Sequence, residues 1–214
     1  MTLIDQETLF PALIKTIRQS AESIAEGIDA IKDLAADGTV LENIPIASTA
    51  VKVLRIKDAF SQNRLERNCR EFLRAMSTSS PVDVEGLNAA LSDQPDGADE
   101  FTDTVVSVLI EGQKPIKASL LGRLVVALSQ GRITFEEFEQ LSQIVHAAPV
   151  PSLNAIPKFF ARSGGSASMN GTGRIEEEPL LMSLGAATRF GTGFYVSRLG
   201  KQLYEIGFEG QVRD

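Results

Sequence analysis

The feature that most limits the fold of this chain is a row of eight apolar residues that recur at steps of four and three near its start. The row comprises Phe10, Ile14, Ile17, Ala21, Ile24, Ile28, Ile31 and Ala35. This spacing places all eight on one side of an α-helix. Pro11 suits the first turn of that helix, and Gly38 suits its C-terminal cap. We expect the helix to pack within a bundle of its own chain. Pairing of residues 10–35 with a second copy, as a homo-oligomer, is the alternative, because the row is long enough for a coiled coil.

Helical spacing continues through the middle of the chain. A second helical stretch is expected from Thr49 to Met76, with a break at residues 61–63, where the apolar positions lose phase. The portion after the break carries one apolar stripe, made of Leu65, Cys69, Phe72 and Met76. Shorter helices are expected within residues 82–99 and over 98–110.

The clearest local signals follow. Pro115 suits the start of a helix, and Gly131 suits its end. Thr134 and Glu137 have the spacing of a capping box, which indicates that another helix begins directly after the turn. The two helices together predict an αα-hairpin.

The composition changes after residue 148. Residues 149–175 are rich in Pro, Gly and Ser and are expected to form a connection with only short helical pieces. Residues 176–214 indicate a helix, a β-hairpin with strands at 188–190 and 194–196, and a closing helix. The predicted fold class is therefore mainly α, with a multi-helix bundle over residues 1–148 and a small winged-helix-like C-terminal region.

Few side chains of this chain suit catalysis. The 214 residues include one cysteine, Cys69, one histidine, His146, and no tryptophan. Zinc sites and nucleophilic mechanisms draw mainly on those two residue types. Cys69 lies on an apolar helical stripe, and His146 lies at a helix end, so both have structural interpretations. We expect no metal, no cofactor and no enzymatic activity. A site made only of carboxylates is the enzymatic alternative.

The sequence also bears on the compartment. One cysteine makes no intramolecular disulfide, and the first ten residues lack the basic and apolar regions of a secretory signal. No window of about 20 residues is apolar and free of charge, as a membrane span requires. We expect a cytoplasmic protein without a membrane span.

Charge is distributed unevenly along the chain, whose 21 basic and 28 acidic residues give a net charge of −7. Residues 49–80 carry a net charge of +4, between 1–48 with −5 and 81–112 with −8. Such a pattern has two uses. The basic segment can pair with the acidic segments of its own fold, or it can bind an acidic partner.

The basic residues of that segment gather on one helix face. Arg67, Arg70 and Arg74 lie opposite the apolar stripe. Glu66 and Glu71 are placed to pair with Arg70 and Arg67 at a spacing of four residues. We take the three arginines as candidate partner-binding residues.

The C-terminal region resembles the wing and closing helix of winged-helix domains, on the strength of the hairpin around Gly191-Thr192-Gly193 and the helix that Ser197 can cap. In members that read DNA, the helix before the wing enters the major groove and offers basic or amide side chains. Here that helix begins with Glu176-Glu177-Glu178, which repels phosphates, so protein contact is the expected use. The alternative is a DNA-binding transcriptional regulator. Its contact residues would be Arg189, Arg198 and Lys201.

The layout as a whole resembles a group of uncharacterised bacterial proteins. The features that carry this resemblance are Ile44-Pro45-Ile46, Arg70-Glu71-Phe72-Leu73, Lys117, Gly131-Arg132-Ile133-Thr134 and Phe138. The resemblance implies a place among antiviral-defence or mobile-element genes. Together with the residue-based observations, it predicts a protein-interaction or adaptor protein, with nucleic acid as the less favoured partner.

Overall fold

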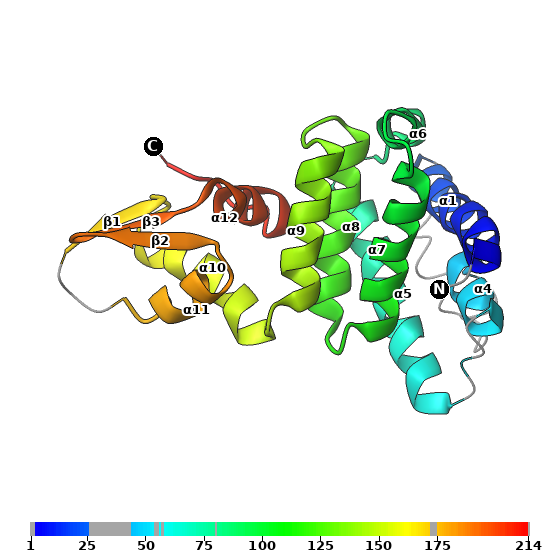
Figure 1. Ribbon diagram of the computed structural model, residues 1–214, viewed down its shortest axis with the longest axis horizontal. Coiled ribbons are helices and arrows are strands. Elements are labelled where there is room, and N and C mark those ends of the chain that lie inside the picture. Colours follow the sequence, from blue (N-terminus) through cyan, green and yellow to red (C-terminus); the bar gives the residue numbers. More distant parts are fainter. Residues whose placement is uncertain are drawn as a thin grey trace. The chain divides into compact units, whose positions relative to one another are not determined.

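The computed structural model describes residues 3–25, 44–53, 56, 58–79, 81–171 and 175–213. They form a mainly helical protein with one small antiparallel sheet near the C-terminus (Figure 1). This confirms the predicted mainly α class. None of the helices in these ranges is both long and apolar enough to cross a membrane.

The contacts of the chain divide it into two compact units, which we call unit 1 (residues 1–139) and unit 2 (residues 140–214). The division falls inside a helix. Unit 1 therefore ends at residue 139, whereas the predicted helical bundle extends to residue 148.

Unit 1 is built from helices, two of which pack closely against each other at its centre. Its helices are α1 (Leu3–Ala25), α4 (Pro45–Val53), α5 (Ala59–Ser79), α6 (Val84–Ser92), α7 (Gly97–Glu111), α8 (Pro115–Ser129) and the start of α9 (Phe135–Ala147). Among the elements that the structure describes, α5 and α8 form the most extensive contact. The predicted stripe of α5 is buried as expected, with Leu65, Cys69, Phe72 and Met76 each at most 1% exposed.

The contact between α5 and α8 is close because of a glycine. A Cβ atom on Gly122 of α8 would lie 2.5 Å from the carbonyl oxygen of Phe72 and 3.2 Å from the Cβ of Ala75. The absence of a side chain at Gly122 therefore lets the two backbones approach each other. Small residues at this crossing set the helix spacing.

Helix α1 presents a different face to the core than the predicted row suggests. Leu9, Leu13 and Ile17 are fully buried, whereas Phe10 and Ile14 are half-buried. The core face is thus one residue out of step with the row at its start. The portion of the row from residue 26 to residue 35 lies outside the described residues, and the pairing of residues 10–35 with a second copy stays a prediction.

The predicted break in the second helical stretch exists, but it lies earlier in the chain. Helix α4 ends at Val53 and α5 begins at Ala59, so residues 61–63 are helical. Val53 and Leu65 therefore belong to two separate helices. The loss of phase between Phe60 and Leu65 falls inside α5, where Phe60 is exposed and does not belong to the buried stripe.

The predicted turn between α8 and α9 is confirmed in detail. The Thr134 backbone N–H donates to Glu137 Oε2 at 3.0 Å, and the Glu137 N–H donates to Thr134 Oγ1 at 3.2 Å, which is the predicted capping box. Gly131 has a φ of 66°, a conformation that glycine adopts without strain. Phe138 is fully buried, 5.4 Å from Phe101 between ring centroids.

Glu139 in α9 provides a prediction about pH. Partial burial raises the pKa of its carboxyl group, Glu100 adds to this, and a hydrogen bond from Thr104 Oγ1 at 3.0 Å opposes it. An acid with a raised pKa in the folded state costs stability while it is ionised. That cost is fully present above the folded-state pKa and disappears below the ordinary value of 4.5. We expect Glu139→Gln to raise the free energy of unfolding at pH 7.

Chemical unfolding at a series of pH values, followed by circular dichroism, measures this effect. The difference between Glu139→Gln and the unchanged protein should shrink as the pH falls and vanish below pH 4.5. Glu136 in the same helix is exposed, and Glu136→Gln serves as the control. A difference that grows toward low pH would contradict the prediction.

Unit 2 combines helices with a three-stranded sheet. Its elements after α9 are α10 (Val150–Arg162), β1 (Ser168–Asn170), α11 (Glu178–Ser183), β2 (Ala187–Phe190), β3 (Gly193–Val196), α12 (Arg198–Gln202) and a π-helical turn, η1 (Leu203–Gly207). The strand order is β1-β3-β2, and both pairs are antiparallel. The predicted hairpin is confirmed, and Ser197 caps α12 by accepting from the Gly200 N–H at 3.2 Å. The winged-helix resemblance stays a prediction.

Two elements of unit 2, helix α10 and strand β1, lie in residues 149–175, which we expected to form a connection with only short helical pieces. Helix α10 spans Val150–Arg162 and is longer than the short pieces expected. Pro151 lies in its first turn, where a missing N–H costs nothing, and only Pro157 interrupts its hydrogen bonds. The buried side chains that offset this cost are Leu153, Ile156, Phe159 and Phe160.

Aromatic contacts hold the core of unit 2. Phe194 of β3 is fully buried, with its ring centroid 5.3 Å from that of Phe159. The rings of Phe160 and Tyr204 are stacked at 3.9 Å with an angle of 5° between their planes. Helix α10 is thereby packed against both the sheet and the C-terminal helical turns.

Candidate functional site

The start of α5 is fixed by an aspartate. Asp58 accepts a hydrogen bond from the Ser61 backbone N–H on its Oδ1 at 2.7 Å, the pattern of a helix N-cap. Hydrogen bonds from Ser61 hold the pKa of the Asp58 carboxyl below its usual value. The helix therefore begins directly before Phe60, and the direction of the Phe60 side chain follows from helix geometry.

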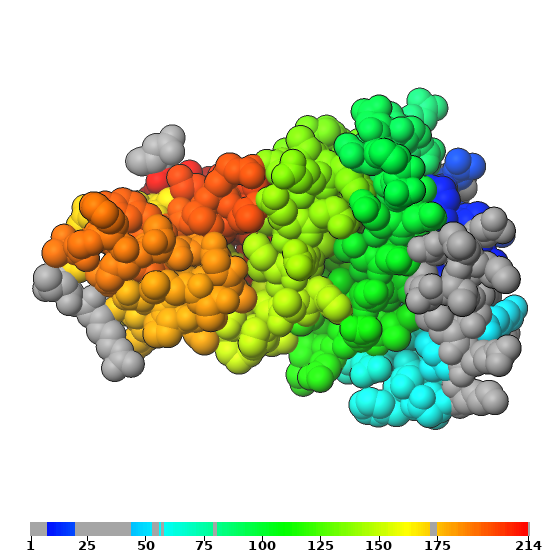
Figure 2. Space-filling view, viewed as in Figure 1, coloured from blue at the N-terminus to red at the C-terminus, as the bar shows by residue number. Residues whose placement is uncertain are grey.

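Four residues of α5 share the face opposite its buried stripe. Phe60, Asn63, Arg64 and Arg67 follow one another at steps of three, one and three residues, which brings them together on a helix. Phe60 and Arg67 are exposed, and Arg64 is half-buried. The N-terminal turns of α5 lie at the surface of unit 1 (Figure 2, cyan).

The loop between α7 and α8 is tied to this face by two neighbouring residues of α5. The Asn68 amide nitrogen is buried and donates to the carbonyl oxygens of Leu109 at 2.9 Å and Gly112 at 2.6 Å. Arg67 Nη2 donates to the carbonyl oxygen of Gln113 at 3.1 Å. Asn68 thus satisfies carbonyl groups at the end of α7, and the loop is held beside α5.

The helix face and the loop line a cleft of about 600 Å³ that is open to solvent. We call it the cationic cleft; its lining residues are Phe60, Asn63, Arg64, Arg67, Gln113 and Lys114. Three of these side chains are basic, two are amides and one is aromatic. Of the described residues that line the cleft, none is acidic. The cleft therefore presents positive charge within a chain whose net charge is −7.

Phe60 and Arg64 form the aromatic portion of the cleft. Arg64 Cζ lies 5.8 Å from the centroid of the Phe60 ring, within the range of a cation–π contact. The Nε atom of Arg64 is buried and has no hydrogen-bond partner among the described residues. Phe60 is still 75% exposed, so most of its ring remains available for contact.

The structure divides the three arginines predicted as partner-binding residues. Arg67 lines the cationic cleft. Arg70 pairs with Glu66, as predicted, whereas Arg74 Nη1 lies 3.8 Å from Glu71 Oε1. The predicted pair of Glu71 with Arg67 is replaced by the hydrogen bond from Arg67 to Gln113. Arg70 and Arg74 thus each have an acidic neighbour within α5, and their role in partner binding stays a prediction.

Of the six lining residues, sequence reasoning identified Arg67 and missed the other five, which are Phe60, Asn63, Arg64, Gln113 and Lys114. The spacing of Phe60 could have identified it. Phe60 lies five residues before Leu65, and on a continuous helix this spacing places its side chain about 140° around the helix from the buried stripe. The apolar pattern instead groups Phe60 with the positions before the break. Lys114 carries no signal, because only the tertiary hydrogen bonds of the loop bring it to α5.

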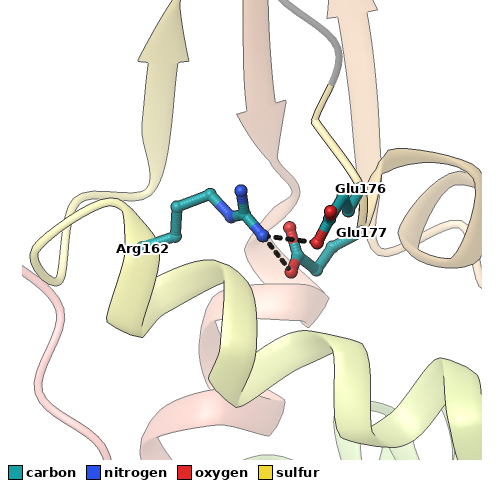
Figure 3. A network of polar contacts seen from close by, with 3 residues as sticks. All are labelled: Arg162, Glu176 and Glu177. Carbon is teal, nitrogen blue, oxygen red and sulfur yellow. Dashed lines mark hydrogen bonds and ion pairs between the residues drawn. The ribbon is translucent and has the colours of Figure 1, made fainter.

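The acidic triplet at the start of α11 is neutralised inside unit 2. Arg162 Nη2 of α10 lies 2.8 Å from Glu176 Oε2 and 3.1 Å from Glu177 Oε1, as Figure 3 shows. The Glu177 side chain is 7% exposed, and its Oε2 has no partner among the described residues. The hydrogen bonds to Glu177 and Glu176 raise the pKa of Arg162. This network connects the end of α10 to the start of α11.

The third acid of the triplet holds one of the residues considered for DNA contact. Arg189 of β2 binds Glu178 through Nε at 2.5 Å and Nη2 at 2.6 Å, a bidentate pair that lowers the pKa of Glu178. A guanidinium used in this way has few donors left for a phosphate. Arg198 is exposed, with Nη1 3.3 Å from Gln202 Oε1, and Lys201 is half-buried in the last turn of α12.

The two reactive residue types occupy structural positions. Cys69 is 1% exposed on α5, and burial raises the pKa of its thiol to about 12, which disfavours the nucleophilic thiolate. His146 lies in the last turn of α9. Within the ranges that the structure describes, no group of three or more His, Cys, Asp or Glu side chains is placed to hold a metal ion.

The cationic cleft brings together basic, amide and aromatic side chains at the surface of unit 1. Its charge, its exposed ring and its amides suit contact with an anionic partner. Comparisons of the chain with protein families, curated proteins and solved structures gave no match.

Proposed function

We propose that this protein is a non-enzymatic interaction protein that binds an acidic segment of a partner protein in the cationic cleft. The observation that carries the proposal is the lining of the cleft, in which Arg64, Arg67 and Lys114 accompany an exposed ring and no acid is among the described lining residues. Asp58, which interacts electrostatically with Arg64, lies outside this lining. Carboxylates of a partner would complement the positive charge of the cleft.

The lining favours a protein segment over a small apolar ligand. Sites for small molecules are lined predominantly by apolar and aromatic side chains, with a few polar groups that fix orientation. Here five of the six lining residues are polar or charged, and the cleft is open to solvent. A hydrated, negatively charged chain segment fits this balance.

The charge of unit 1 favours a short acidic segment over a nucleic-acid backbone. Unit 1 carries 14 basic and 22 acidic residues, and the segment 81–112, which includes α6 and α7, has eight acidic residues and no basic one. A phosphate backbone carries charge along its whole length and extends beyond the cleft. A short peptide needs only the cleft itself.

A labelled acidic peptide tests the proposal. We expect a ten-residue peptide of Glu and Ser to bind at about 50 mM salt and to dissociate at about 500 mM, because exposed ion pairs are screened by salt. The double variant Arg64→Gln/Lys114→Gln should bind about tenfold more weakly, which corresponds to two exposed charge contacts. Fluorescence anisotropy measures both effects.

The matched control is Arg74→Gln/Arg132→Gln, which removes the same charge from exposed positions of unit 1 outside the cleft. Its affinity should stay within a factor of about two of the unchanged protein. Equal weakening by the two double variants would contradict the proposal, and so would a failure of the unchanged protein to bind at low salt. Tighter binding of duplex DNA than of the peptide would favour the DNA-binding alternative instead.

A further inference from the structure

We propose that the acidic segment bound in the cationic cleft carries one aromatic side chain. This side chain stacks on Phe60, and the carboxylates of the segment lie on either side of it. This inference rests on the proposed function and narrows it. It concerns the class of segment that the cleft selects.

The first observation is the exposure of the Phe60 ring. At 75% exposed, Phe60 leaves more apolar surface in water than any core position of unit 1, where phenylalanines such as Phe72 and Phe101 are fully buried. Its position in the first turn of α5 is fixed by the Asp58 cap, so the ring cannot turn toward the core without loss of that cap. A partner that covers the ring gains from removal of apolar surface.

The second observation is the position of the charges around the ring. Arg64 contacts the ring, and Arg67 is one helical turn further along the same face. Lys114 approaches from the loop. A purely acidic segment would leave the Phe60 ring hydrated, and a purely apolar one would cover three cations without a countercharge, which is costly. A segment with both properties avoids both costs.

The third observation concerns the amides. Asn63 and Gln113 line the cleft on its two sides, one from α5 and one from the loop. Amide side chains both donate and accept hydrogen bonds, so they suit the backbone of an extended segment. The cleft thus has an aromatic ring that can stack on an aromatic side chain of the partner, cations that can pair with its carboxylates, and amides that can bond to its backbone.

The test uses the absence of tryptophan from this chain. Three peptides of equal charge, Ser-Glu-Glu-X-Glu-Glu-Ser with Trp, Leu or Gly at X, are titrated with the protein. Anisotropy of a terminal label gives the affinities, and the emission of the peptide tryptophan reports its burial without interference. We expect the Trp peptide to bind about tenfold more tightly than the Gly peptide, with Leu between them and a blue-shifted Trp emission.

Phe60→Ala is the decisive variant. Phe60 is exposed, so its removal should not disturb folding, which circular dichroism verifies. We expect Phe60→Ala to abolish the difference in affinity between the Trp and Gly peptides. Phe190→Ala is the matched control, because Phe190 is 83% exposed on unit 2 and should have no effect.

The outcomes separate this inference from the proposed function. If all three peptides bind with equal affinity and equal salt dependence, the aromatic preference is wrong and the acidic-segment proposal stands. If none binds at low salt, both are wrong. If Phe60→Ala still binds the Trp peptide more tightly than the Gly peptide, the aromatic side chain of the peptide does not stack on Phe60, and the inference is wrong.

Discussion

Phe194→Ala is expected to lower the free energy of unfolding of unit 2 by about 3–5 kcal/mol, the usual cost of such a truncation in a core. Phe194 is fully buried on β3, the central strand of the sheet. Its ring contacts Phe159 at 5.3 Å, and Phe159 in turn contacts Phe160 at 5.6 Å. The truncation removes a ring from this aromatic row and leaves a cavity between α10 and the sheet.

The two tyrosines of the chain make this change measurable. Tyr195 and Tyr204 both lie in unit 2, and the chain has no tryptophan, so the tyrosine signal in near-ultraviolet circular dichroism follows unit 2 alone. Urea titration of Phe194→Ala should show this signal lost at a lower concentration. Phe190→Ala, at an exposed position of the same hairpin, should stay within about 0.5 kcal/mol of the unchanged protein. Coincident titrations of Phe194→Ala and the unchanged protein would contradict the packing of this core.

Gly122→Ala is expected to lower the free energy of unfolding of unit 1 by about 1–3 kcal/mol. The sign is opposite to that of helix propensity, since alanine inside a helix is normally favoured over glycine by about 0.5–1 kcal/mol. The added Cβ would lie 2.5 Å from the carbonyl oxygen of Phe72, and a backbone atom cannot turn aside as a flexible side chain does. Helices α5 and α8 must therefore separate along their contact.

Urea titration followed by far-ultraviolet circular dichroism measures this loss. Ser119→Ala is the matched control, because Ser119 is half-buried on the same helix and the change should stay within about 0.5 kcal/mol. A gain in stability for Gly122→Ala would mean that propensity decides at this position. The close approach of the two helices would then be wrong.

The regions of the fold that could be predicted from the sequence are those in which neighbours along the chain decide the outcome. The capping box of Thr134 and Glu137 and the cap at Ser197 depend on residues three positions apart. The stripe from Leu65 to Met76 depends on helical periodicity alone. The stripe is also buried, so the tertiary contacts agree with the local signal there.

The regions that could not be predicted depend on distant contacts. Strand β1 has only three residues, which pair with β3, and so short a strand shows no alternation of apolar and polar residues in the sequence. Helix α10 tolerates Pro157 because its apolar side chains are buried in unit 2, a contribution that local propensity ignores. The face of α1 that is buried depends on the helices around it.

The candidate site shows the same division. The cationic face of α5 was predicted from spacing, and Arg67 belongs to the cleft. Which arginines remain available was not predictable, because Glu71 had two basic neighbours within reach and the structure pairs it with Arg74. Lys114 joins the site only because Asn68 holds the preceding loop residues against α5.

The hydrogen bond from Arg67 to Gln113 has a consequence for kinetics. It holds one cationic side chain of the cleft in place before a partner arrives, so less conformational entropy is lost at the moment of binding. Charges act at long range and speed the encounter with a partner. The contact with the Phe60 ring, which the partner covers on binding, acts only at short range and slows dissociation. For a partner of the proposed class, added salt should therefore slow association, and loss of the Phe60 ring should shorten the lifetime of the complex.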